Sequence, residues 1–103
     1  MKAKEFDEIY KTLVDSRLSL IQKKRNDYAG DDNVFDNFEE TARQLNLTVD
    51  QVFLFWITIK RQRLSNLLVN CRSPKNESVE DTLEDLSNYV DLYNIYRKGR
   101  GDK

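Results

Sequence analysis

The fold follows from residues 52–60, Val52-Phe53-Leu54-Phe55-Trp56-Ile57-Thr58-Ile59-Lys60, the most apolar part of the chain. An α-helix turns by roughly 100° per residue, so Lys60 falls on one stripe with Phe53, Trp56, Leu64 and Leu67. An ammonium group is costly to remove from water unless an anion or hydrogen bonds compensate it. The sequence therefore predicts a carboxylate or a bound phosphate beside Lys60.

The same helical spacing of apolar residues occurs on both sides of this stretch. Thr48 and Gln51 form the pattern of a capping box, which opens the central helix. Pro74 breaks the pattern after it, because proline cannot continue the hydrogen-bond ladder. The sequence predicts helices over Lys4–Asn26, Val34–Leu45, Val49–Asn70 and Ser78–Arg97.

Length and composition favour one small all-α domain. The chain has 103 residues, of which 34% are charged, and it holds only three glycines and one proline, too few for a turn-rich β-fold. We expect a compact bundle of about four helices over residues 1–97, followed by a flexible tail at 98–103. The Arg100-Gly101-Asp102 tripeptide in this tail is interpreted as a chance occurrence.

Several functional classes are disfavoured by composition. The formal net charge of −1 makes binding to nucleic acid unlikely, and no apolar run reaches the ~20 residues of a membrane helix. A single cysteine, Cys71, excludes an internal disulfide, and without histidine no serine or cysteine has the usual base to activate it. These features predict a cytoplasmic protein that does not bind membranes.

The last predicted helix combines an apolar stripe with acidic residues. Its core stripe is expected to be Val79, Leu83, Leu86, Val90 and Tyr93. Asp81, Asp85 and Asn88 fall near the opposite face, which is either solvated or functional.

Apolar residues also project nearly all round the central helix. One small domain covers such a helix only in part, so we expect a homo-oligomer, although a plain core helix explains the pattern about as well. Lys60 and Arg63 on this helix either pair with Asp81 or Asp85, or bind a ligand.

A further cluster lies between the first two predicted helices. It contains Lys24, Asp27, Tyr28 and Asn37, with Phe35 and Phe38 close by. Cations, amides and aromatic rings suit the binding of phosphate and base, but regularly spaced phenylalanines are more often core residues.

These residues form motifs that resemble a known group of proteins. The motifs are Lys24-Arg25-Asn26-Asp27-Tyr28, Asn37-Phe38-Glu39, Lys60 with Arg63-Leu64, Glu77-Ser78 and Asp81-Thr82-Leu83-Glu84-Asp85-Leu86-Ser87-Asn88-Tyr89. The chain resembles small phage and prophage proteins grouped with nucleotide-modification-associated domains. More distantly, it is similar to all-α nucleoside triphosphate pyrophosphatases of the MazG and dUTPase type.

The resemblance implies an oligomeric helical bundle that recognises a nucleotide. The pyrophosphatases hold Mg²⁺ with carboxylates from two helices. This chain instead has Lys60-Arg61-Gln62-Arg63 where the first carboxylate pair is expected. An ammonium group repels a divalent cation, so the metal cage is incomplete by this pattern.

Three hypotheses follow. The first is a phage-type protein that binds a nucleotide, or sequesters a host defence signal, through Lys24, Asp27, Tyr28, Asn37, Lys60, Arg63 and Asn88. The second is a Mg²⁺-dependent pyrophosphatase with Glu77, Asp81 and Asp85 as metal ligands. The third is a small interaction protein that binds a host protein. If the protein is viral, its location is the host cytoplasm.

Overall fold

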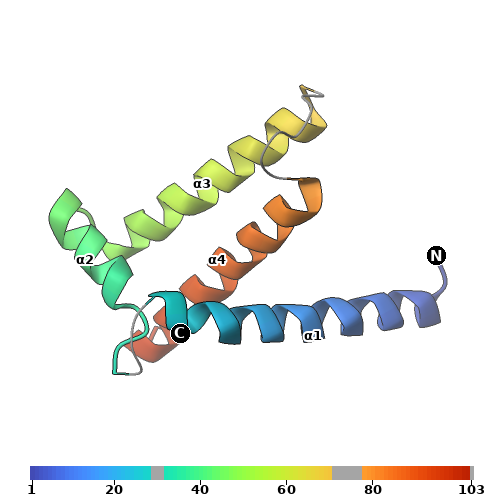
Figure 1. The fold of residues 1–103 in the computed structure, drawn as a ribbon, viewed down its shortest axis with the longest axis horizontal. Helices are drawn as coiled ribbons and strands as arrows, with labels where there is room; N and C mark the ends of the chain where they lie inside the picture. The colour runs from blue at the N-terminus through green and yellow to red at the C-terminus, as the bar shows by residue number, and fades with distance from the viewer. Residues whose placement is uncertain (29–31, 71–77, 103) are drawn as a thin grey trace. The chain divides into compact units, whose positions relative to one another are not determined.

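The computed structural model describes residues 1–28, 32–70 and 78–102, apart from the side chains of Asn26 and Tyr28. These residues form four helices and no strand: α1 (Ala3–Tyr28), α2 (Asp36–Leu45), α3 (Val49–Leu68) and α4 (Val79–Arg100). The all-α prediction is confirmed (Figure 1). None of the helices in the described part of the chain is long and apolar enough to cross a membrane.

The chain divides into two compact units, Met1–Val34 and Phe35–Lys103. The first unit holds α1, and the second holds α2, α3 and α4. Each unit is described by itself, and the single domain expected over residues 1–97 stays a prediction.

Capping boxes begin the two longest helices of the second unit. Before α3, the Thr48 hydroxyl accepts from the Gln51 amide at 3.1 Å, and the Gln51 side chain accepts from the Thr48 amide at 2.9 Å. Before α4, the Ser78 hydroxyl accepts from the Asp81 amide at 3.1 Å, and the Asp81 carboxylate accepts from the Ser78 amide at 3.5 Å. Each box satisfies amide groups that have no partner within the helix. The predicted box at Thr48 is confirmed.

The end of α4 differs from the prediction. The helix continues to Arg100 instead of ending at Arg97, and Gly101 terminates it with φ of +94°, a left-handed conformation that suits glycine. The Asp102 carboxylate then accepts from both Arg97 and Arg100, at 3.2 and 2.6 Å. Residues assigned to a tail by their polarity therefore cap the helix.

An aromatic cluster forms the core of the second unit. Phe53 is completely buried, and its ring stacks on Phe38 of α2 with centroids 4.6 Å apart. Phe35 meets Tyr96 of α4 edge-on at 5.1 Å, and Tyr93 lies 5.3 Å from Phe53. The cluster joins all three helices of this unit. Packing in the core is therefore confirmed for Phe35 and Phe38.

Helices α3 and α4 run antiparallel, side by side (Figure 1). As the residue number increases along α3, the number of the contacting residue on α4 decreases: Phe53 contacts Tyr93, Trp56 contacts Tyr89, and Lys60 contacts Asp85. Each step is about one helical turn, so a continuous row of side chains from each helix forms this contact.

The predicted core stripe of α4 is wrong in part. Leu83 and Val90 are 48% and 49% exposed, whereas Thr82, Asn88 and Leu92 are buried. The Thr82 hydroxyl donates to the Ser78 carbonyl at 2.8 Å, which satisfies it without water. Counting apolar residues alone missed Thr82 and Asn88, because polar side chains share the inner face of α4 with Leu92.

In the first unit, α1 forms a single helix of 26 residues. Its apolar side chains lie on one stripe, as predicted, and six of the larger ones are exposed: Phe6, Ile9, Tyr10, Leu13, Val14 and Leu18.

Candidate functional site

The contact between α3 and α4 brings together three of the predicted site residues. The Lys60 ammonium lies 2.8 Å from the Asp85 carboxylate, with 13% and 27% of the two side chains exposed. Asn88 follows Asp85 by one turn of α4 and is only 5% exposed. The anion that the sequence required beside Lys60 is therefore Asp85.

Two aromatic rings lie one helical turn from this ion pair, both on the same side of it. Trp56 precedes Lys60 by one turn of α3, and Tyr89 follows Asp85 by one turn of α4. The rings are stacked with their centroids 5.8 Å apart and their planes 8° from parallel, and both residues are half-buried. Trp56, Lys60, Asp85, Asn88 and Tyr89 are called the α3–α4 cluster below.

Two other predicted residues of the second unit, Arg63 and Asn37, are exposed. Arg63 is exposed and lies on α3 three residues beyond Lys60. Asn37 is an exposed residue near the start of α2, and its backbone carbonyl accepts from the Thr41 hydroxyl at 2.8 Å. That bond involves the backbone of Asn37, a residue of α2 that is not part of the α3–α4 cluster.

The residues predicted from the N-terminal cluster lie in the first unit. Lys24 is half-buried and Asp27 is exposed, both near the end of α1. Tyr28 is the last residue of α1, and its side chain lies outside the described part of the structure.

The carboxylates predicted to bind Mg²⁺ do not form a shared site in the described structure. Asp81 belongs to the capping box of α4, and Asp85 is paired with Lys60. Glu77 lies outside the described residues. Within residues 1–28, 32–70 and 78–102, no three Asp, Glu, His or Cys side chains are grouped to hold a metal ion. The metal site stays a prediction, and an ammonium group 2.8 Å from Asp85 disfavours a divalent cation there.

A second polar cluster was missed by the sequence analysis. Asp50, in the first turn of α3, accepts two hydrogen bonds from Arg100, both at 3.0 Å, and one from the Tyr93 hydroxyl at 2.6 Å. Through its bonds to Asp50, Arg100 joins the start of α3 to the end of α4. Arg100 also donates to the Asp102 carboxylate. The antiparallel arrangement of the two helices could have predicted this cluster. If Lys60 lies beside Asp85, then Asp50, ten residues earlier on α3, lies near the end of α4.

Hydrogen bonding controls the charges in this second cluster. The bonds from Arg100, and then from Tyr93, lower the pKa of Asp50 to about 2. The bond to the Asp50 carboxylate raises the pKa of Tyr93, because it favours the protonated phenol. Asp50 is therefore ionised and Tyr93 neutral near pH 7.

A shallow depression of about 240 Å³ lies beside Asp50, lined by Asp50, Gln51, Leu54, Ile57 and Tyr93. Its only described charge is the carboxylate already held by Arg100 and Tyr93. That carboxylate already accepts three hydrogen bonds, and Leu54 and Ile57 give the depression an apolar part.

Comparison of the chain with known proteins gives no match, either to a protein-family model, to a curated protein or to a solved structure.

Proposed function

We propose that this chain is a nucleotide-binding protein and that its ligand contacts the α3–α4 cluster. One observation carries the proposal: a cation, a buried amide and two stacked aromatic rings occur within two helical turns of one helix pair. A nucleotide offers the matching groups, which are a phosphate, polar base edges and a flat base.

Each member of the cluster has a role in this proposal. The Lys60 ammonium binds the phosphate, and Asp85 orients the ammonium when no ligand is present. Trp56 and Tyr89 supply ring faces that attract a base by stacking. The Asn88 side chain supplies donors and an acceptor suited to a base edge.

The family resemblance supports the same assignment. Lys60, Asp85, Asn88 and Tyr89 all belong to the motifs in which this chain resembles the phage and prophage proteins named above. The proposal therefore includes a phage or prophage origin, a place in the host cytoplasm and an oligomeric state. Its biological role would be to sequester a nucleotide, including a host defence signal.

Binding without turnover is favoured over hydrolysis. A pyrophosphatase needs carboxylates free to hold Mg²⁺, but Asp81 caps α4 and Asp85 pairs with Lys60. Release of pyrophosphate from any nucleoside triphosphate in the presence of Mg²⁺ would overturn this preference and restore the enzymatic alternative.

Trp56 provides a direct test, because it is the chain's one tryptophan and belongs to the cluster. Its fluorescence should change on titration with nucleoside mono-, di- or triphosphates or cyclic dinucleotides, and much less with the parent nucleosides. Lys60→Met should weaken binding strongly, whereas Arg61→Met removes an exposed neighbouring cation and should have little effect. Equal loss in both variants would indicate only general charge attraction.

A second candidate function is binding of a protein partner. Exposed apolar side chains on the outer faces of α3 and α4 favour it, namely Leu54, Phe55, Leu83, Val90 and Ile95. A stoichiometric partner that co-purifies with the wild type, is lost in Leu83→Lys with Val90→Lys, and is indifferent to nucleotides would support this alternative.

A further inference from the structure

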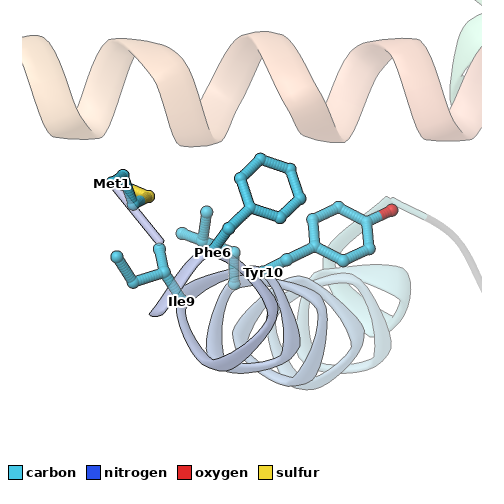
Figure 2. Close-up of a pocket in the computed structure, with 5 residues that line it drawn as sticks. Met1, Phe6, Ile9 and Tyr10 are labelled. Carbon is cyan, nitrogen blue, oxygen red and sulfur yellow. The ribbon is translucent and has the colours of Figure 1, made fainter. Parts of the chain in front are cut away.

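The exposed stripe of α1 is the largest apolar feature of the first unit. Its six side chains, from Phe6 to Leu18, are between 38% and 59% exposed. Figure 2 shows Phe6, Ile9 and Tyr10 projecting from the helix, with Met1 beside them. With Leu13, these residues line an apolar concavity of about 190 Å³.

This stripe needs a covering surface. Among its described residues, 1–28 and 32–34, the first unit contains one helix and no second helix or strand. An isolated helix gains little stability in water from its own hydrogen bonds and depends on burial of its apolar face. The stripe continues through Leu20 and Ile21, which are half-buried, so its apolar length is about 22 Å at 1.5 Å per residue.

The charges of α1 indicate what covers it. Residues 4–15 hold four carboxylates and two lysines, whereas residues 16–27 hold four cations and one carboxylate. Acidic residues early and basic residues late also suit the helix's own dipole. Two copies laid antiparallel bring each acidic half against a basic half, whereas a parallel pair opposes like charges.

We propose that α1 pairs antiparallel with α1 of a second copy of this chain. The two-fold axis passes near Leu13 and Val14, so that Phe6 of one copy lies opposite the region of Leu20 and Ile21 of the other. The concavity at Phe6, Ile9 and Tyr10 then receives apolar side chains from the second half of the partner helix. This dimer is independent of nucleotide binding by the α3–α4 cluster.

The size of the contact indicates a reversible dimer. A helix pair about 22 Å long buries on the order of 1,000 Å² in total, at the lower end of specific interfaces. Sedimentation of the full chain over a range of concentrations should therefore show a monomer–dimer equilibrium.

A matched pair of substitutions tests the surface. Leu13→Glu places a charge at the centre of the stripe. Thr12→Glu places the same charge on the preceding residue, which is not part of the stripe. Leu13→Glu should weaken dimerisation roughly a hundredfold, because each dimer carries the change twice. Thr12→Glu should change it little. A chain that is monomeric at all concentrations, or a dimer that tolerates Leu13→Glu, would overturn the proposal.

Spin labels test the orientation. In a Cys71→Ser background, one variant carries a label at Lys4→Cys and another at Thr12→Cys. An antiparallel pair places the two labels of the first variant about 30 Å apart and those of the second much closer, because position 12 is near the two-fold axis. Short distances in both variants would mean a parallel pair and would contradict the proposal.

Discussion

At Lys60, one charge in an apolar stripe pairs with a carboxylate of the neighbouring helix. Its ammonium is 2.8 Å from the Asp85 carboxylate, and both side chains are largely removed from water. Such pairs add little net stability over apolar replacements, but loss of one partner leaves the other charge poorly solvated. The pair therefore joins α3 to α4 at this point of their contact.

A double-mutant cycle on Lys60→Met and Asp85→Leu tests this description. Each single change should lower the free energy of unfolding by about 1–3 kcal/mol, because it leaves one charge with reduced solvation. The double variant should be more stable than the sum of the single changes predicts, as measured by urea denaturation. Strictly additive effects would mean that the two groups do not interact.

The low pKa of Asp50 predicts how the stability of the fold changes with pH. Its pKa is about 2 in the folded protein against an ordinary value of 3.8, so its ionised form stabilises the fold above pH 3.8, and this stabilisation is lost as pH falls toward 2. Asp50→Asn should lower the melting temperature by a few degrees at pH 7, since the group is partly exposed and screened by solvent. The difference from wild type should shrink below pH 4. A difference that is constant from pH 7 to pH 2 would contradict the assigned role.

At the scale of the helix, α4 buries polar residues and exposes apolar ones. Thr82 and Asn88 are buried, and Leu83 and Val90 are about half exposed. The order of the helices and the capping box at Thr48 were predicted from spacing and residue chemistry, and Asp85 was one of the two carboxylates considered as a partner of Lys60. The inward face of α4 was not, because its burial depends on hydrogen bonds and ring contacts with α3, which a count of apolar residues does not include.

The N-terminal cap of α4 predicts how substitutions of Ser78 change the stability of the protein. Ser78→Ala removes the side chain that accepts from the Asp81 amide and should cost about 1 kcal/mol of stability. Ser78→Gly removes the same group but leaves the amide accessible to water, so it should cost only a few tenths of a kcal/mol. Equal losses in chemical denaturation would argue against the capping role.

For the molecule as a whole, the aromatic cluster holds the second unit together, while apolar surface remains for other contacts. Phe53 is completely buried between three helices, whereas Phe55, two residues later, is 55% exposed. The sequence placed Phe53 on the stripe of Lys60, but it did not predict how far Phe55 would be exposed, because the stretch is apolar on nearly every side.

These two phenylalanines form a matched pair. Phe53→Ala should cost about 3–5 kcal/mol, because it leaves a cavity among Phe38, Tyr93 and Tyr96. Phe55→Ala should cost much less and should leave the core unchanged. Thermal unfolding of both variants measures the difference, and similar losses would mean that the core is assigned to the wrong residue.

The most direct test of the central proposal is titration of Trp56 fluorescence with nucleotides, in wild type and in Lys60→Met. We expect a saturable change for at least one nucleotide, with the nucleotide recovered intact and the affinity strongly reduced in Lys60→Met but not in Arg61→Met. No change with any nucleoside phosphate or cyclic dinucleotide, in a protein that is folded by circular dichroism, would contradict nucleotide binding at the α3–α4 cluster.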